Sequence, residues 1–219
     1  MSCGKPLKVL MIHGYRQNAT TSREKSGAFR KMTKRHLEPV FVSAPLVVPP
    51  RADGSTPADA DERGWWFSSA DQSFAASQKS ELCAGFEESL AVLREVAERE
   101  GPFDGVLGFS QGAALVGLLC ALQQRQELEW SFRFAILVAG FRSRSAPHQK
   151  LYEERIELPT LHVYGDNDQV IPREMSEDLV QLYSNATVLR HAGGHHIPAS
   201  GKEKPVYLQF LESMRSAAS

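Results

Sequence analysis

Six short apolar segments, spread along the whole sequence, limit this chain to a small set of folds. They are rich in leucine and β-branched residues, and most are continuously apolar instead of alternating with polar residues. That pattern is typical of strands in a parallel sheet that is covered on both faces. The segments are 7–12, 39–44, 103–109, 133–139, 160–165 and 186–192.

Helical patterns occupy most of the intervals between these segments. Thr21 and Glu24 have the spacing of a capping box, which predicts a helix start there. Strands that alternate with helices predict right-handed crossovers and an open α/β sheet. The other expected helices are 79–100, which ends at Gly101-Pro102, one that follows Ser110, 173–183 and 203–217.

The segment 45–77 interrupts this alternation. It contains four of the 12 prolines and is too long for an ordinary connection, so it is a disordered linker or a functional loop. Trp65, Trp66 and Phe67 argue against complete disorder. We expect one domain over 1–219 with this segment as a loop insertion, in which the three aromatic residues contact substrate or anchor the loop to the body of the protein.

Composition excludes several classes of function and site. The 25 basic and 26 acidic residues give a net charge of −1, so we expect no nucleic-acid partner and no anionic-membrane partner. Three cysteines without a CxxC motif predict neither a disulfide framework nor a zinc site. No apolar run reaches the roughly 18 residues of a membrane helix, and no signal peptide is evident, so we expect a cytoplasmic protein with passive access to the nucleus.

The stretch 105–119 is typical of a strand, a tight turn and an apolar helix, with Ser110 at the turn. Gly108, Ser110 and Gly112 form the GxSxG pattern, which indicates a nucleophile elbow when it lies between a buried strand and a helix. Side chains at the two glycine positions would collide with the neighbouring strand and helix. The alternative is that Ser110 serves only as the N-cap of the helix.

A serine nucleophile needs an acid and a base, which in this kind of fold follow it in that order along the chain. Asp166 and Asp168 follow the fifth apolar segment, and His195 and His196 follow the sixth. Both pairs therefore come at carboxyl ends of strands, where open α/β sheets bind ligands. Spacing alone does not select within either pair, and Asx-turn chemistry is the alternative for each aspartate. The agreement of three elements in the expected order favours a nucleophile over an N-cap.

The first strand ends in His13-Gly14, a turn that in such hydrolases supplies one donor of an oxyanion hole. The expected backbone N–H donors are those of Tyr15 and of Gln111, which directly follows the serine. The simpler interpretation of His13-Gly14 is a tight turn between strand and helix, and both can hold together. His191 and His195 have the i, i+4 spacing of metal ligands, but the glycines between them disfavour a helix, so we expect no metal.

Motifs from about Leu7 to Phe210 together resemble those of the family serine hydrolases, the FSH-type α/β-hydrolases of fungi and animals. They include HGYRQN, RGWWF, GPFDGVLGFSQGAALV, HVYGDNDQVIP and GGHHIP. The resemblance implies a trimmed α/β-hydrolase core of about six parallel strands in the order 2-1-3-4-5-6, with helices on both faces. It also implies that Ser110 is the nucleophile, Asp168 the acid and His195 the base.

The resemblance further implies a serine esterase of the carboxylesterase type that acts without a metal or organic cofactor. Its expected substrates are small-molecule carboxylic esters with straight, medium-to-long acyl chains, hydrolysed through an acyl-enzyme. One alternative is an acyl thioesterase with the same triad, which a comparison of matched oxygen and thiol esters would distinguish. The other is a non-catalytic binding module, which predicts that a fluorophosphonate probe leaves Ser110 unlabelled.

Overall fold

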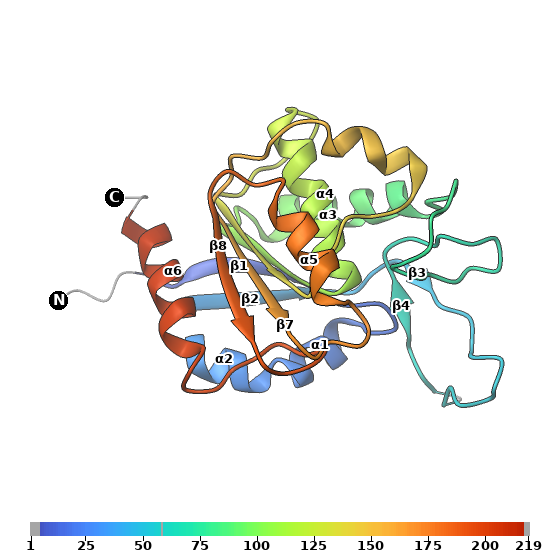
Figure 1. Cartoon of the computed structure of the whole chain (residues 1–219), viewed down its shortest axis with the longest axis horizontal. Coiled ribbons are helices and arrows are strands. Elements are labelled where there is room, and N and C mark those ends of the chain that lie inside the picture. The colour runs from blue at the N-terminus through green and yellow to red at the C-terminus, as the bar shows by residue number, and fades with distance from the viewer. Residues whose placement is uncertain (1–4, 58, 217–219) are drawn as a thin grey trace.

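Six parallel strands form the centre of the molecule (Figure 1). The structure is a computed structural model that describes residues 5–57 and 59–216. The order across the sheet is β2-β1-β5-β6-β7-β8, and every neighbouring pair is parallel, which confirms the predicted order. The strands are β1 (Leu7–Ile12), β2 (Leu37–Val42), β5 (Gly105–Phe109), β6 (Phe134–Val138), β7 (Thr160–Gly165) and β8 (Ala186–His191).

Helices cover both faces of the sheet (Figure 1), as the near-continuous apolar strands predict. One face carries α3 (Phe86–Glu100), α4 (Gln111–Gln124) and α5 (Arg173–Val180). The other carries α1 (Ala19–Lys25), α2 (Gly27–Thr33) and α6 (Lys204–Ser216). No helix within the described ranges has both the length and the apolar character needed to cross a bilayer.

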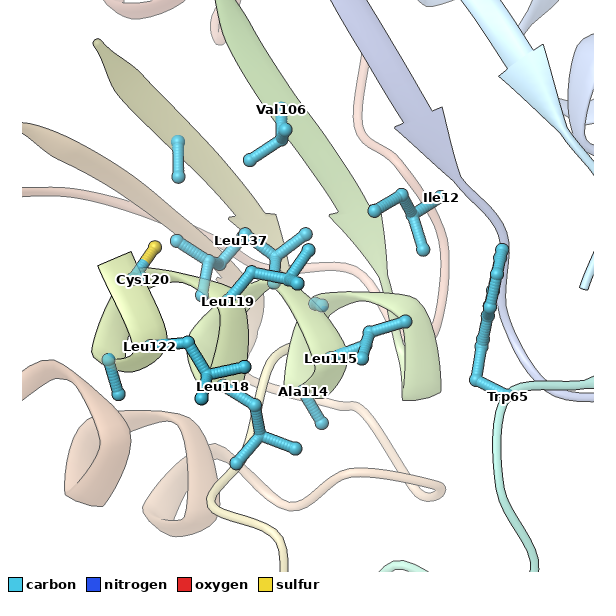
Figure 2. Close-up of a cluster of buried hydrophobic side chains, with 14 of the residues drawn as sticks. Ile12, Trp65, Val106, Ala114, Leu115, Leu118, Leu119, Cys120, Leu122 and Leu137 are labelled. Atoms are coloured by element: carbon cyan, nitrogen blue, oxygen red, sulfur yellow. The ribbon is translucent and has the colours of Figure 1, made fainter. Parts of the chain in front are cut away.

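The larger hydrophobic cluster surrounds α4, which is buried on all sides from Gln111 to Leu122 (Figure 2). A helix that is apolar all round belongs in the interior of a protein. Because α4 is packed in this way, it holds Ser110, the residue directly before it, against the sheet. Trp65 belongs to the same cluster and lies beside the start of α4 and the end of β1 (Figure 2). The long insertion is therefore part of the core at this point.

The first helix begins differently from the predicted capping box. Asn18 is the N-cap of α1, its side chain accepts a hydrogen bond from the N–H of Thr21, and the Thr21 hydroxyl accepts one from the N–H of Asn18. Thr21 is thus the third helical residue, and the predicted start at Thr21 with Glu24 is wrong. The physical reason is that the Asn18 side chain reaches the free N–H groups of the first turn.

The helix expected over 79–100 starts only at Phe86. Gly85 directly before it has φ of +83°, a left-handed conformation that a helix does not continue through. Ala84 instead forms an isolated bridge with Phe67, and Ser80 one with Ser145. Tertiary pairing with distant segments therefore overrides the helical pattern of 79–84.

The insertion after β2 contains a two-stranded antiparallel sheet, β3 (Leu46–Val47) and β4 (Arg63–Gly64). It projects from one end of the central sheet (Figure 1). A second irregular segment, which includes the 3-10 helix η1 (Ala146–Tyr152), follows β6, and its Ser145 forms a bridge with Ser80, between the insertion and α3. Two loops from different strands thus combine beside the carboxyl ends of the sheet.

Candidate active site

Ser110 lies in the sharp turn that joins β5 to α4. Its backbone has φ of 54° and ψ of −117°, a conformation that costs a non-glycine residue about 1–3 kcal/mol. The turn is held by the N–H of Ser110, which donates to the carbonyl oxygen of Val138 at 2.9 Å. The Ser110 side chain makes no capping hydrogen bond to α4, so its hydroxyl is available to other partners.

Two glycines make this turn sterically feasible. A Cβ atom on Gly108 would come within 2.4 Å of the carbonyl oxygen of Gly112. A Cβ atom on Gly112 would come within 2.3 Å of the carbonyl oxygen of Ile12, at the end of β1. The start of α4 therefore lies directly against both β5 and β1, which the GxSxG pattern predicts on steric grounds.

A hydrogen-bonded chain links Ser110 to residues from two other strand ends. Nε2 of His195 is 3.1 Å from Oγ of Ser110, and Nδ1 of His195 is 2.8 Å from Oδ2 of Asp168. The side chain of Asp168 is 1% exposed and that of His195 is 20% exposed. A carboxylate can only accept, so Nδ1 carries the proton and Nε2 is free to accept the proton of the serine hydroxyl.

The second oxygen of Asp168 is also fully used. Oδ1 accepts hydrogen bonds from the backbone N–H groups of Val170 and Ile171, both at 2.8 Å. Two backbone donors stabilise the ionised carboxylate and fix its plane. The orientation of His195 is therefore set by a side chain that is itself held by the backbone.

The structure places the alternative residues elsewhere. Asp166 is exposed and forms ion pairs with Arg190 and Arg173, the latter at 3.8 Å. His196 is exposed and packs against the ring of His191, with ring centroids 5.1 Å apart. None of these groups is hydrogen-bonded to Ser110 within the described residues. The structure thus brings Asp168 and His195, of the two possible pairs, to the serine.

The two expected oxyanion donors come from two segments that meet beside Ser110, the end of β1 and the start of α4. Gln111 is the first residue of α4, and Tyr15 follows the turn at the end of β1. Neither backbone N–H has a hydrogen-bond partner among the described residues. Tyr15 and Ser110 also line the same pocket. The geometry is compatible with the predicted oxyanion hole.

A pocket of about 400 Å³ opens over Ser110. Its wall is mainly apolar, and Val170 at its edge is 59% exposed. A mainly apolar wall around one reactive polar group is typical of a site for a small, largely apolar ligand. The lining residues are Gly14, Tyr15, Gln17, Phe74, Ala75, Ala76, Ser77, Phe109, Ser110, Val170, Ile171 and His195.

The predicted substrate contacts Trp65, Trp66 and Phe67 are not in this wall. Both tryptophans are 0% exposed and Phe67 is 6% exposed, so all three belong to the core. This placement corrects the prediction that they contact substrate. Close packing in the core leaves no ligand access to their rings. They anchor the insertion to the body of the protein, which was the other interpretation of the motif.

Comparisons with known proteins show the family of this chain. A family model described as serine hydrolase (FSH1) matches residues 1–206. The chain belongs to the FSH1 serine hydrolase family. A relative in Danio rerio, named Esterase OVCA2, is 49% identical over 94% of this chain and 97% of its own length. The protein of the same name in Homo sapiens is 42% identical over 97% of this chain and 98% of its own length.

Solved structures share the fold of this FSH1-family hydrolase. Arabidopsis thaliana SOBER1 matches with a TM-score of 0.63 at 16% identity, covering 96% of this chain and 99% of that one. Zea mays acyl-protein thioesterase 2 matches with a TM-score of 0.65 at 17% identity, covering 95% and 94%. At this level of identity the likeness supports the α/β-hydrolase fold alone.

The site of this FSH1-family hydrolase includes residues that sequence patterns did not single out. Phe74 and Phe109 line the pocket, and the ring centroids of Phe109 and His195 are 4.8 Å apart. Phe74 comes from the irregular insertion, where no periodicity indicates which side chains face inward. Phe109 directly precedes the serine, a position whose side chain direction depends on the strained turn.

His13 is a further residue at this site, and its side chain is more constrained than a tight turn alone predicts. It is fully buried, its Nδ1 lies 2.8 Å from the carbonyl oxygen of Gly14, and its Nε2 accepts from the N–H of Ala44 at 2.9 Å. Burial lowers the pKa of His13 from 6.5 to about 4. Since a carbonyl only accepts, the ring is neutral with its proton on Nδ1.

Proposed function

We propose that this hydrolase cleaves carboxylic esters with straight, medium-to-long acyl chains, with Ser110 as nucleophile, His195 as general base and Asp168 as the acid of the triad. The observation that carries the proposal is the continuous chain from Asp168 through His195 to Ser110, at the floor of an apolar pocket. The relatives named as esterases support ester hydrolysis as the reaction.

In the acylation step, Nε2 of His195 removes the hydroxyl proton as Oγ of Ser110 attacks the ester carbonyl carbon. The carbonyl electrons move to oxygen, and the N–H groups of Tyr15 and Gln111 donate hydrogen bonds to this oxyanion. Asp168 stabilises the imidazolium that forms. Collapse of the tetrahedral intermediate breaks the bond to the alcohol, which leaves with the proton from His195.

In the deacylation step, His195 removes a proton from water, and the resulting nucleophile attacks the acyl-enzyme. A second tetrahedral intermediate forms in the same oxyanion hole. Its collapse releases the carboxylic acid and returns the proton to Oγ of Ser110. No step requires a group beyond the residues named and water.

The pocket supports the choice of acyl group. Phe74, Ala76 and Ile171 give it an apolar wall, and about 400 Å³ is more than an acetyl group needs. Each buried CH₂ group contributes about 0.8 kcal/mol to binding, so lengthening the chain raises kcat/KM until the pocket is full. The small side chains of Ala75 and Ala76 leave room along one wall, and the expectation of straight chains follows from the family resemblance.

The test is hydrolysis of a series of alkanoyl esters that share one alcohol and differ only in chain length. We expect kcat/KM to rise from acetate to medium or long chains, and Ala76→Phe to move the optimum to shorter chains by filling the pocket. Ala70→Phe is the matched control, because Ala70 lies on the same segment, is exposed and is not in the pocket wall. A flat profile, or one that peaks at acetate, would contradict the chain-length proposal.

Two further measurements separate the reaction from its alternatives. A fluorophosphonate probe is expected to label the protein, and Ser110→Ala is expected to abolish that labelling; an unlabelled wild-type protein would point to a binding module.

Matched oxygen and thiol esters of one acyl chain are expected to show faster turnover of the oxygen ester. Clearly faster thioester turnover would instead identify an acyl thioesterase.

A further inference from the structure

Trp65 forms hydrogen bonds with the residues on both sides of the proposed oxyanion hole. Its indole Nε1 donates to the carbonyl oxygen of His13 at 2.8 Å, and its backbone N–H donates to Oε1 of Gln111 at 3.0 Å. The hydroxyl of Ser89, from α3, donates to the carbonyl oxygen of Trp65. The hydrogen bonds of Trp65 therefore join the end of β1 and the start of α4 through the insertion.

On the β1 side, two consecutive peptide groups are fixed. Trp65 holds the carbonyl of His13, and the His13 ring holds the carbonyl of Gly14 at 2.8 Å. The carbonyl of Gly14 and the N–H of Tyr15 belong to one planar peptide group and point in opposite directions. Fixing that carbonyl thus fixes the direction of the Tyr15 N–H.

On the α4 side, the side chain of Gln111 is fully buried and uses both of its polar atoms. Oε1 accepts from the N–H of Trp65, and Nε2 donates to the carbonyl oxygen of Trp66 at 2.8 Å. A buried amide with both ends paired is rigid, because breaking either bond leaves an unsatisfied group. The backbone N–H of Gln111 is held with it.

Resting on the proposed function, we propose that Trp65 is a positioning residue that sets the separation of the two oxyanion donors, through the carbonyl of His13 on one side and the side chain of Gln111 on the other. Trp65 does not touch substrate. It acts through its indole N–H and its backbone N–H, so the insertion contributes to the chemistry from the core and not from the pocket wall.

The neighbouring Trp66 provides a matched comparison within the chain. Both tryptophans are 0% exposed, and the Trp66 ring packs against Phe74, Phe86 and His148. Nε1 of Trp66 has no hydrogen-bond partner among the described residues. Replacing either tryptophan with phenylalanine removes a similar volume, but only Trp65→Phe removes a side-chain hydrogen bond, the one to the carbonyl oxygen of His13.

The experiment compares Trp65→Phe with Trp66→Phe in the full chain. Trp65→Phe is expected to lower kcat about tenfold with KM within about twofold, because the oxyanion donors act mainly in the transition state. It is also expected to weaken, about tenfold, inhibition by an alkyl trifluoromethyl ketone. Oγ of Ser110 bonds to the carbonyl carbon of this inhibitor as its hydroxyl proton passes to Nε2 of His195, and the carbonyl electrons form an oxyanion that occupies the same hole. Trp66→Phe is expected to change both quantities by less than about twofold.

Thermal unfolding of both variants supplies the structural control. If Trp65 only packs, the two variants lose similar stability and keep similar kcat and inhibitor affinity, and the inference is overturned. Gln111→Met keeps the backbone N–H but removes both side-chain hydrogen bonds, so it is expected to lower the same two quantities even if Trp65→Phe does not fold. Unchanged kcat in folded Gln111→Met would also contradict the inference. An inactive, unlabelled wild-type protein would instead contradict the proposed function.

Discussion

Within the part of the chain that the structure describes, two serine–histidine pairs are hydrogen-bonded, and their surroundings differ. Ser110 and His195 lie 3.1 Å apart, Oγ to Nε2, at the floor of the pocket. Ser143 and His148 lie 2.7 Å apart, Oγ to Nδ1, and both are 2% exposed. By distance alone the second pair is the closer one, so a short contact between serine and histidine does not define a nucleophile.

The differences lie in what surrounds each pair. His195 is hydrogen-bonded to a carboxylate, whereas Nε2 of His148 has no partner among the described residues. Burial lowers the pKa of His148 from 6.5 to about 4, which makes it a weak base. Ser110 has the strained backbone of the turn, while Ser143 takes part in a loop network with Tyr152. A pocket does not separate the two pairs, because Ser143 also lines one, of about 520 Å³. Only the first pair has a carboxylate partner and a strained turn.

The largest expected effect separates the two serines directly. Ser110→Ala should lower kcat by about 10⁴-fold or more and abolish labelling by a fluorophosphonate, because no other hydroxyl lies against His195 among the described residues. Ser143→Ala is the matched control and should keep both labelling and turnover. Mass spectrometry of the labelled peptide is the measurement. Labelling found on Ser143 would reverse the assignment of the two pairs.

The next effect removes the acid that only the first pair has. Asp168→Asn should lower kcat about 10⁴-fold with little change in fold. The side-chain oxygen must stay on Val170 and Ile171, whose N–H groups donate to it, so the new amide nitrogen faces Nδ1 of His195. The ring then places its proton on Nε2 and cannot accept one from Ser110. Asp166→Asn, assayed in parallel, should stay within about twofold of the wild type.

A smaller effect is expected on stability at the second pair. Ser143→Ala leaves the buried ring of His148 without its partner, which should lower the free energy of unfolding by about 1–3 kcal/mol. Urea unfolding followed by circular dichroism measures this change. Unaltered stability would mean that the hydrogen bond between Ser143 and His148 contributes nothing net to the fold.

The smallest effect is a change in the pH dependence of stability. The pKa of His148 is about 4 when folded and about 6.5 when unfolded, so the unfolded chain binds more protons in this interval. The contribution of His148 to the free energy of unfolding is therefore complete above pH 6.5. It decreases as the pH falls towards 4, by up to about 1.4 kcal/mol per pH unit. His148→Phe should remove that share of the slope, measured by urea unfolding between about pH 7 and pH 5.

His13 and His162 provide the internal control for this slope. Burial lowers the pKa of His13 to about 4 and that of His162 to about 3. Both histidines therefore make stability fall with falling pH, as His148 does, and both are still present in the variant. We therefore expect His148→Phe to reduce the acid dependence without eliminating it. An identical slope in the variant and the wild type would show that His148 is not neutral and buried in solution.

Strand positions were predictable because a strand that is buried on both faces consists of a continuous run of apolar residues. Segments 7–12 and 160–165 match β1 and β7 to the residue. Helix starts were less predictable, since they depend on local competition. Asn18 replaces Thr21 as a cap, and Gly85 delays α3 while 79–84 pairs with distant loops.

At the site, chain order located the candidates but could not choose among them. Asp166 and Asp168 both follow β7, and only the path of the turn decides which one faces inward. His195 and His196 differ in the same way. The motif Trp65-Trp66 was noticed for its aromatic character, but no periodicity reports that Trp65 donates to His13 whereas the indole N–H of Trp66 has no partner among the described residues.

The two backbone donors to Asp168 have a consequence for how this enzyme can change. Val170 and Ile171 hold the carboxylate through their N–H groups and also form part of the pocket wall. Under the proposed function, a substitution that reshapes this wall for a different acyl group would shift the same backbone that orients Asp168. Selectivity and turnover would then be linked traits, and laboratory evolution towards new substrates should find freer variation at Phe74 and Ala76, which come from the insertion and not from the loop that holds Asp168.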